Sequence, residues 1–236
     1  MSPNRPQQAQ IRYCPIKHQT GQNRSGQSLL YRLPHASTQS RFKRSLVILG
    51  AVVGLIILGL LIVPIAIAIT LDSDGPILYS QERFGLQGKP FTLWKFRSMV
   101  SNADALKAAV ANESQGLIFK NEADPRITRI GRFLRKTSLD EFPQFWNVLR
   151  GDMSLVGTRP PTGDEVVHYT DRHWQRLDVR PGMTGQWQVS GRSAIKDFED
   201  IVTLDLLYQA QWTPIYDVQL LVKTVMTLLS KQAGAC

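Results

Sequence analysis

An uncharged apolar segment from Ser45 to Leu71 constrains the fold of this 236-residue chain more than any other feature. At about 1.5 Å per residue, a helix over this segment is about 40 Å long, which exceeds the ~30 Å hydrocarbon core of a bilayer. A helix this long and this uniformly apolar is rare inside a soluble protein. The segment also begins too late, and runs too long, for a simple secretory signal. We therefore predict one membrane helix over residues 45–71.

Pro64 lies in the last third of this segment and predicts a kink, because proline lacks an N–H and its ring collides with the preceding turn. Two topologies follow. A straight helix would cross the bilayer and place residues 72–236 outside the cytoplasm, whereas a helix that turns back would keep both flanks cytoplasmic. Arg41, Lys43 and Arg44 predict a cytoplasmic N-terminal end. Composition alone leaves both topologies open.

Gly50 and Gly54 have the spacing of small residues at helix–helix contacts in membranes. They predict either the seam of a homodimer or the ordinary glycine content of a membrane helix. We favour the second interpretation, and a homodimer is left open.

The net charge of +9 is concentrated in the N-terminal residues. Residues 1–45 carry eight basic and no acidic side chains, while the other 191 residues carry 20 basic and 19 acidic ones. A nucleic-acid-binding domain is expected to carry its basic surplus on its folded part, so we predict no nucleic-acid partner. The tail is rich in Gln, Ser, Asn and Pro, which is typical of disorder. Cys14 and Cys236 have no metal-ligand spacing and support neither a zinc site nor a disulfide framework.

The residues after the apolar segment predict a helix-rich mixed α/β fold with a small sheet, since strands and helices do not alternate regularly. Residues 77–85 and 91–99 are predicted strands, and Lys95 and Arg97 share one face of the second strand by its two-residue period. The predicted helices cover residues 103–112, 126–136, 138–150, 197–211 and 215–229.

The segment 126–136 reads as a basic amphipathic helix. Its apolar face is formed by Ile127, Ile130, Phe133 and Leu134, and basic side chains cover the rest. Such a helix close to a membrane anchor indicates contact with anionic headgroups. A solvated surface helix packed on the core is an equal alternative.

Asp140 and Glu141 are the leading candidates for chemistry. Ser138 and Glu141 have the spacing of a capping box, so both carboxylates could serve only the start of a helix. Pro143 argues against that simple interpretation, because proline is unfavourable within the first two turns. The basic residues nearby supply the cations that phosphoryl transfer requires.

At this point the sequence resembles a family. The segments that carry the resemblance are LYSQERFG, WKFRSM, DPRITRIGRFLRKTSLDEFPQFWNVLRGDMSLVGTRP, RPGMTGQWQVSGR and LDLLYQ. In this order they are similar to the bacterial sugar transferases, the monotopic phosphoglycosyl transferases that initiate exopolysaccharide or other glycan assembly. The resemblance covers roughly residues 42–230.

The resemblance implies a mechanism. The matching nucleophile, Asp140, would attack the β-phosphate of a UDP-sugar, release UMP and hold the phosphosugar covalently. Polyprenyl (undecaprenyl) phosphate would then accept the phosphosugar. Glu141 would help to bind Mg²⁺ and manage the protons of the acceptor.

The resemblance also implies the cationic part of the site. Arg135 and Arg159 match positions that engage phosphate and nucleotide, Lys95 and Arg97 match a basic pair near the active site, and Arg192 matches a loop near the nucleotide.

Two departures from the family pattern stand out. Thr158 replaces a proline before Arg159, and we expect it to loosen the loop that positions this arginine. Pro64 lies about a turn later than the usual helix break and has no adjacent serine, although Thr70 follows it. We still favour the re-entrant topology, because a cytoplasmic donor requires a cytoplasmic site.

The predicted organisation is a basic disordered cytoplasmic tail (residues 1–44), a membrane helix kinked at Pro64 (45–71) and a membrane-associated catalytic domain (72–236). The expected location is the cytoplasmic face of the bacterial inner membrane, with membrane lipids, a UDP-sugar and polyprenyl phosphate as partners. UDP-galactose or UDP-glucose is the expected donor. The alternatives are a metal-dependent glycosyltransferase that releases UDP and a non-enzymatic basic membrane anchor.

Overall fold

The computed structural model describes residues 17–22, 28–31, 34–191 and 195–229, and the chain divides into two units, residues 1–34 and 35–236. In the first unit, β1 (Lys17–Gln22) and β2 (Ser28–Tyr31) pair as antiparallel strands. In the second, residues 35–44 form α1 and the first turn of a long helix. Both observations differ from the prediction that residues 1–44 form a disordered tail.

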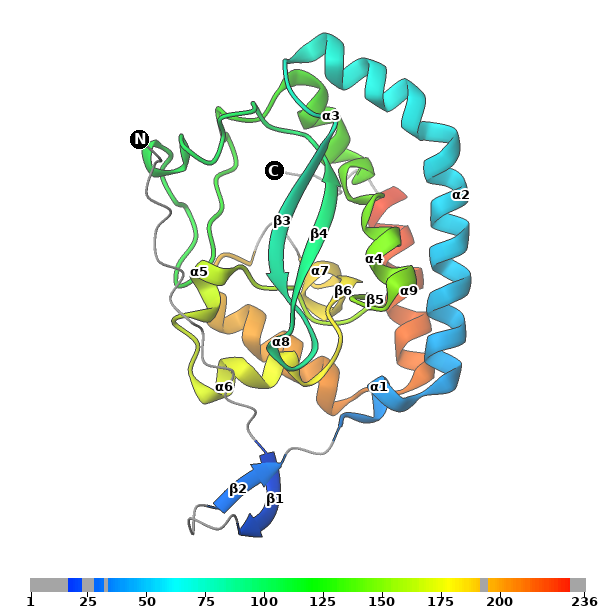
Figure 1. Ribbon diagram of the computed structural model, residues 1–236, viewed down its shortest axis with the longest axis vertical. Coiled ribbons are helices and arrows are strands. Elements are labelled where there is room, and N and C mark those ends of the chain that lie inside the picture. The colour runs from blue at the N-terminus through cyan, green and yellow to red at the C-terminus, as the bar shows by residue number, and fades with distance from the viewer. Residues whose placement is uncertain (1–16, 23–27, 32–33, 192–194, 230–236) are drawn as a thin grey trace, which may run out of the picture. The chain divides into compact units, whose positions relative to one another are not determined.

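The second unit is helix-rich, as the sequence predicts, and contains two small sheets where one was predicted (Figure 1). Its strands are β3 (Leu78–Phe84), β4 (Pro90–Phe96), β5 (Ser154–Val156) and β6 (Gly182–Thr184). Its α-helices are α1 (Ala36–Gln39), α2 (Arg41–Asp72), α3 (Arg129–Lys136), α4 (Gln144–Arg150), α5 (Gly163–Val166), α6 (Asp171–Trp174), α7 (Gln186–Val189), α8 (Phe198–Ala210) and α9 (Pro214–Leu229). Short 3₁₀ helices cover Leu86–Gly88, Lys107–Ala109, Leu139–Glu141 and Gln175–Asp178.

The long helix α2 contains the whole predicted membrane segment. It is continuous over 32 residues with Pro64 inside it, and its length and composition suffice to cross a membrane. It begins at Arg41, where the Ser40 hydroxyl accepts a hydrogen bond from the Lys43 N–H at 3.2 Å. In Figure 1, α2 rises along one side of the unit and bends over its top toward α3.

Two glycines let α2 approach its own globular unit closely. A Cβ added to Gly50 would lie 2.5 Å from Leu155, and one added to Gly54 would lie 2.4 Å from the ring of Phe145. These positions therefore contact β5 and α4 of the same chain. Both glycines therefore have a packing role within the chain that their sequence spacing did not reveal, and a homodimer stays a prediction.

Both ends of α2 are bound to this unit by polar contacts. At its start, Lys43 forms an ion pair with Asp217 of α9 at 2.9 Å and donates to the Tyr208 hydroxyl at 2.7 Å. At its end, Asp72 accepts a hydrogen bond from the Ile130 N–H of α3 at 2.9 Å. Between these ends, buried apolar side chains of α2 pack on α4, β5 and α3.

The hairpin β3–β4 confirms the two predicted strands, and the pairing of Tyr79 with Lys95 places both on one face. The predicted helix over residues 103–112 is wrong. This segment forms turns and the 3₁₀ helix Lys107–Ala109. Only Ala103 of its five alanines is buried, so a helix here would have little core to pack against.

The basic amphipathic helix is shorter than predicted, since α3 begins at Arg129 after the N-cap Thr128. Arg126 lies before the helix and is buried, bound to Asp124 at 2.6 Å. Phe133 lies exposed among basic side chains instead of on the buried face. The predicted helices near the C-terminus are confirmed by α8 and α9.

We predict that Gly54→Val destabilises the protein whereas Gly59→Val does not. A side chain at position 54 would overlap Phe145, while nothing lies within 4 Å of a Cβ at Gly59. Overpacking of this kind costs roughly 1–3 kcal/mol. Thermal unfolding in detergent should therefore show a lower melting temperature for Gly54→Val only. Equal melting temperatures would contradict the close contact between α2 and α4.

Candidate functional site

A cavity of about 500 Å³ brings together six of the seven predicted site residues. It is lined by residues from the hairpin, α3, the 3₁₀ helix Leu139–Glu141 and the loop after β5. The predicted residues among them are Lys95, Arg97, Arg135, Asp140, Glu141 and Arg159. Arg192 lies outside the described residues.

Asp140 and Glu141 are held by a 3₁₀ helix directly after α3. Ser138 precedes them with φ 57°, a left-handed conformation that is uncommon for residues other than glycine. The predicted capping box is wrong, because the Ser138 side chain caps nothing and α4 begins only at Gln144. Pro143 stands just before that helix, where its missing N–H costs no helical hydrogen bond. The sharp change of direction at Ser138 places the Asp140 side chain at the cavity while the residue is 6% exposed.

Two cations accompany these carboxylates. Lys95 of β4 forms an ion pair with Glu141 at 3.1 Å, and both side chains are partly buried. Arg135 of α3 donates to the Ser98 hydroxyl at 2.9 Å. Burial lowers the pKa of Arg135, and the nearby Asp140 carboxylate opposes this by favouring the charged guanidinium. The four side chains therefore form a partly buried, charge-balanced group at one side of the cavity.

Arg97 lies in the cavity wall but is directed toward the end of α2. Its guanidinium donates to the carbonyls of Asp74 and Ser73, the latter at 2.6 Å. A cation at this position complements the partial negative charge of a helix C-terminus. We therefore assign Arg97 to the attachment of α2 and do not include it in the phosphate-binding group.

The loop that carries Arg159 is fixed by Thr158, contrary to the expectation that this threonine loosens it. Thr158 is fully buried, and its hydroxyl donates to the Arg176 carbonyl at 3.0 Å. Its own carbonyl accepts from the Gly182 N–H at 2.9 Å. The buried Thr158 hydroxyl and its hydrogen bond therefore restrain this loop. The replacement of a proline in the sequence does not reveal that restraint.

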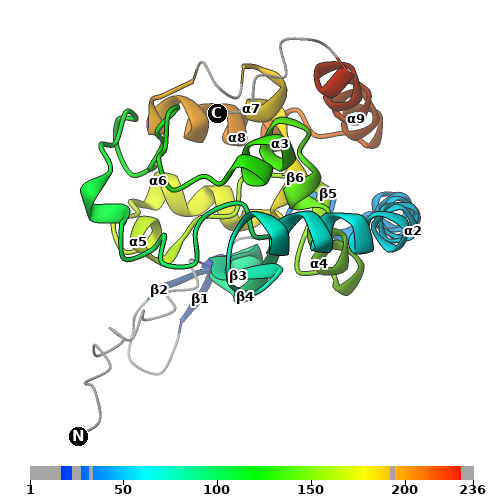
Figure 2. The same cartoon turned by 90° about the horizontal axis from the view of Figure 1, so that it is seen from above.

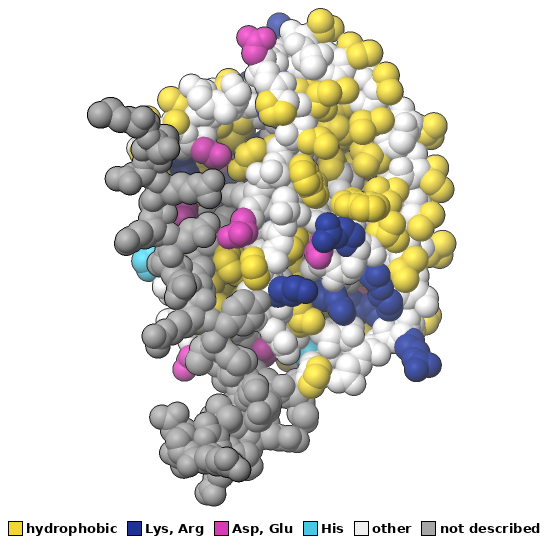
Figure 3. Space-filling view, viewed as in Figure 1, with side chains coloured by type: hydrophobic (Ala, Val, Ile, Leu, Met, Phe, Trp, Pro, Cys, Tyr) yellow, Lys and Arg dark blue, Asp and Glu magenta, His cyan; other side chains and the backbone are white. Residues whose placement is uncertain are grey.

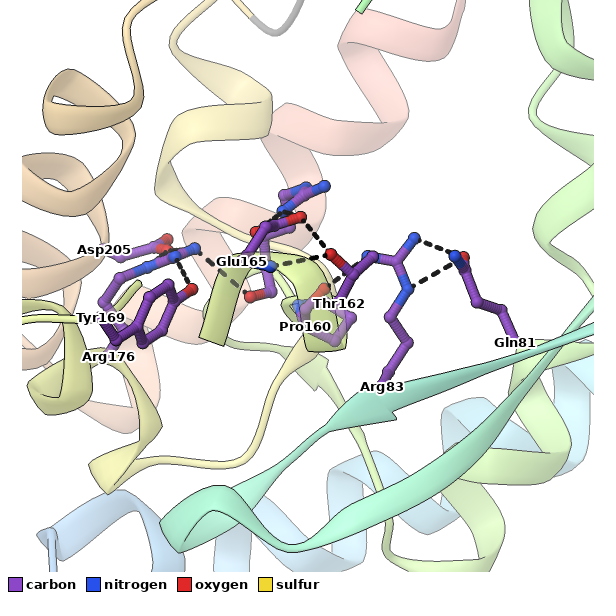
Figure 4. Close-up of polar contacts among 9 residues, drawn as sticks. Gln81, Arg83, Pro160, Thr162, Glu165, Tyr169, Arg176 and Asp205 are labelled. Carbon is purple, nitrogen blue, oxygen red and sulfur yellow. Dashed lines mark hydrogen bonds and ion pairs between the residues drawn. The ribbon is translucent and has the colours of Figure 1, made fainter. Parts of the chain in front are cut away.

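Arg159 is paired with Glu165 of α5. Its Nη1 lies 3.0 Å and 2.7 Å from the two carboxylate oxygens, and Thr162 donates to the same carboxylate at 3.2 Å (Figure 4). Burial disfavours the charge on Glu165, but the attraction and hydrogen bonds of Arg159 outweigh it and hold the pKa of Glu165 below its ordinary value. A second buried pair, Arg176 and Asp205 at 2.7 Å, lies to the left of Glu165 in Figure 4.

The cavity wall also contains Gln81, Arg83 and Glu165, which the sequence did not single out as site residues. Gln81 and Arg83 follow Tyr79 at intervals of two on β3, so they share the face of the hairpin that carries Lys95. Extending the two-residue period from the second strand to the first would have found them. No comparable signal marks Glu165, because its pairing with Arg159 depends on the tertiary fold.

The donor set fits a Mg²⁺ ion held mainly by a substrate. Within the described parts of the chain, no three His, Cys, Asp or Glu side chains are grouped to hold a metal alone. Asp140 and Glu141 offer two adjoining carboxylates at the cavity. Mg²⁺ is commonly bound by one or two carboxylates together with substrate phosphates. Asp140 and Glu141 are therefore the residues that would hold such an ion.

Comparisons with known proteins agree on one family. The model of the family described as bacterial sugar transferase matches residues 38–231. The galactosyl transferase CpsE of Streptococcus agalactiae is 49% identical over 189 residues, which are 79% of this chain and 42% of that protein. The undecaprenyl-phosphate galactose phosphotransferase of Salmonella typhimurium is 44% identical over 84% of this chain and 43% of that protein. The UDP-galactose-lipid carrier transferase of Erwinia amylovora is 42% identical over 85% of this chain and 43% of that protein. The chain thus spans about two fifths of the length of these curated relatives.

We predict that Glu165 makes a pH-dependent contribution to stability. Its folded-state pKa lies below the ordinary value of 4.5, so this contribution is present above about pH 4.5 and is lost as the pH falls through the folded-state pKa. Glu165→Gln should lower stability at pH 7 by roughly 1–3 kcal/mol. It should also show a smaller further loss than the wild type between pH 6 and 3.

The matched control is Asp164→Asn, since Asp164 is adjacent, has an 82% exposed side chain and is paired with the surface Lys107. It should follow the wild-type melting temperature at every pH. A Glu165→Gln profile parallel to that of the wild type would contradict the lowered pKa.

Proposed function

Because the chain belongs to the bacterial sugar transferase family, we propose that it transfers a sugar 1-phosphate from a UDP-sugar to polyprenyl phosphate and releases UMP. The observation that carries this proposal is the adjoining pair Asp140 and Glu141 at a cavity whose wall also holds Lys95, Arg135 and Arg159. A carboxylate among cations suits nucleophilic attack on an anionic diphosphate. The reaction is the first membrane step of exopolysaccharide or related glycan assembly. Three of the relatives are named for galactose, so UDP-galactose is the first donor to test.

In the first step, an oxygen of the Asp140 carboxylate bonds to the β-phosphorus of the UDP-sugar. The bond from this phosphorus to the bridging oxygen breaks, and the electron pair leaves with UMP. The sugar phosphate remains on Asp140 as an acyl phosphate. Covalent catalysis of this kind divides one difficult transfer into two and lets a water-soluble donor and a lipid acceptor use one site in turn.

Lys95 and Arg135 reduce the repulsion between the carboxylate and the diphosphate. Each lies beside one of the two carboxylates, and donors placed where charge develops are commonly worth about 2.7–4 kcal/mol. A bound Mg²⁺ would supply further neutralisation of phosphate charge. Asp140 is held by the turn at Ser138, so its attack requires little reorganisation of the backbone.

In the second step, an oxygen of polyprenyl phosphate bonds to the same phosphorus. The bond from phosphorus to Asp140 breaks, the carboxylate is regenerated, and a polyprenyl diphosphate sugar leaves. Glu141 accepts the proton of an acceptor phosphate that arrives protonated. Its ion pair with Lys95 holds its carboxylate at the cavity.

The re-entrant topology belongs to this proposal and is supported by the contacts of α2. Lys43 at its start and Asp72 at its end bind the same globular unit, which a straight span would prevent unless that unit lay within the bilayer. Hydrophobic side chains gather along α2 in Figure 3, and basic side chains gather beside its first turns. The cavity then lies on the cytoplasmic face of the inner membrane, where the donor is available.

The exposed face of α3 is suited to the headgroup region of the same membrane. Phe133 is 57% exposed, and Arg129, Arg132 and Lys136 are exposed around it. An apolar ring flanked by basic side chains suits the boundary between acyl chains and anionic headgroups. Asp140 follows this helix directly, so the nucleophile would lie close to the lipid surface.

We predict that Asp140→Asn lowers turnover on the order of 10³-fold or more, since an amide cannot act as the nucleophile. Nucleotide release from UDP-galactose with Mg²⁺ and undecaprenyl phosphate, in detergent, measures this loss. UMP is the expected product, whereas UDP would identify a glycosyltransferase that moves only the sugar. The matched control Asp200→Asn changes an exposed carboxylate on α8 and should keep wild-type turnover.

Intact mass after incubation with donor alone provides the direct check. The wild type should gain one sugar phosphate, and Asp140→Asn should gain none. Retained turnover in a correctly folded Asp140→Asn protein would exclude this residue as the nucleophile. Anionic-vesicle binding without nucleotide release from any UDP-sugar would favour the membrane anchor.

We also predict that both flanks of α2 face the cytoplasm. Single cysteines at Gln39 and Asp74, which are exposed, can be introduced after Cys14 and Cys236 are replaced by serine. In oriented membrane vesicles, an impermeant maleimide should label both positions from the cytoplasmic side only. Labelling of the two positions from opposite sides would establish a spanning helix.

A further inference from the structure

We propose that Arg83, together with Arg159, binds the phosphate of the leaving nucleotide. This inference rests on the proposed function and adds to it a residue on β3 that the sequence did not single out. Arg83 lies in the wall of the cavity, and its Nη1 donates to the carbonyl of Pro160 at 2.9 Å. Figure 4 shows this contact between Arg83 and Pro160, and because Pro160 follows Arg159 directly, the two arginines are in neighbouring positions.

The charges of this cluster are not balanced by the side chains around it. Glu165 is the carboxylate of the cluster, and Arg159 contacts both of its oxygens. Arg83 instead has neutral partners among the described residues: Nε and Nη2 donate to Gln81 Oε1 at 3.1 Å and 2.7 Å, and Nη1 donates to Pro160. Burial, and then the nearby charge of Arg159, lower the pKa of Arg83 to about 10, so it remains charged at neutral pH.

Donor groups remain for a ligand. A guanidinium has five N–H donors in a planar fork, an arrangement that suits a phosphate. Arg159 uses Nη1 for Glu165, and its Nε and Nη2 make no hydrogen bond to any residue that the structure describes. Arg83 is held in one orientation by Gln81 and Pro160. An anion between these two guanidiniums would gain charge-assisted hydrogen bonds without a large loss of side-chain entropy.

The position of Arg83 and Arg159 relative to Asp140 indicates that the anion they bind is the leaving phosphate. Lys95 and Arg135 accompany Glu141 and Asp140, which places them at the reacting phosphorus. Arg83 is also close enough to Glu141 for that carboxylate to favour its charge, so the two cationic groups adjoin. A diphosphate contains two phosphorus atoms joined by one oxygen, and two adjoining cationic groups match it.

Arg83 and Arg159 would act in the first step of the reaction. When the bond from the β-phosphorus to the bridging oxygen breaks, the electron pair remains on the α-phosphate, which becomes a phosphomonoester with additional negative charge. Preorganised cations are most effective where charge develops during a reaction. The second step involves no nucleotide. Arg83 is therefore expected to assist release of UMP and not transfer to the lipid.

Binding of UMP to the full-length protein in detergent, measured by calorimetry, tests this directly. Arg83→Gln should weaken UMP binding about tenfold or more, because charge-assisted hydrogen bonds are lost. Lys107→Gln is the matched control, since it removes one positive charge from the same cavity wall at an exposed side chain. It should leave the affinity for UMP within about twofold of the wild type. Equal affinity of the wild type and Arg83→Gln would overturn the proposal.

The two half-reactions distinguish the leaving phosphate from the phosphate of the lipid acceptor. Arg83→Gln should slow the gain of sugar phosphate on the protein about tenfold or more. Once this intermediate has formed, its transfer to undecaprenyl phosphate should proceed at the wild-type rate. A defect confined to the second half-reaction would overturn the proposal in favour of an acceptor-binding role.

Arg83→Lys separates ligand binding from support of the loop. If Arg83 only braced Pro160, the lysine and glutamine variants would lower the melting temperature and slow both half-reactions equally, which would overturn the proposal. Partial recovery of UMP affinity by lysine, at an unchanged melting temperature, supports it. UMP binding also separates this inference from the proposed function. If the protein binds UMP in a way that depends on Arg83 but forms no phosphosugar intermediate, the subsite is supported and the proposed transfer chemistry is not.

Discussion

The attachment of both ends of α2 to one globular unit is the constraint on which the rest of the structure depends. Lys43 is buried and satisfied by Asp217, Tyr208 and the Val156 carbonyl. An ammonium group in such a place is tolerated only when its hydrogen bonds are complete, and removing one partner of a buried pair commonly costs about 3–5 kcal/mol. At the other end, carbonyls of the last turn and of the residues that follow it are bound by Arg97. The apolar helix is thereby held as part of the domain.

This attachment also determines where the candidate nucleophile lies. Ile65 and Ile69 of α2 pack with Leu134 of α3, and α3 leads directly into the turn that carries Asp140. Seen from above in Figure 2, the second half of α2 passes close to α3 and α4. One continuous set of contacts therefore links α2 to Asp140. The depth of α2 in the lipid sets the height of the Asp140 carboxylate above the membrane.

Local sequence patterns predicted the elements well where one physical requirement dominated. The two-residue period of the hairpin, the apolar segment of α2 and the long helices α8 and α9 were all correctly identified. The adjacent carboxylates were also correctly placed beside cations, because the basic residues of α3 precede them in sequence. These features depend on residues that are near neighbours along the chain.

The predictions failed where a distant partner decided the outcome. Ser138 has the spacing of a capping residue, yet it adopts a left-handed conformation and its side chain caps no helix. Thr158 was expected to loosen its loop, but a carbonyl 18 residues away fixes it. Gly54 faces Phe145 rather than another membrane helix. None of these partners can be inferred from a window of neighbouring residues.

The separation between Lys43 and its partners has a consequence for biosynthesis. Tyr208 lies 165 residues further along the chain, and Asp217 follows it on α9. During translation, α2 therefore leaves the ribosome well before the residues that will hold its first turn exist. The contacts that hold its first turn can form only after α8 and α9 have been made. For a period during synthesis, α2 has therefore been made while the contacts that hold its first turn to the globular unit are still missing.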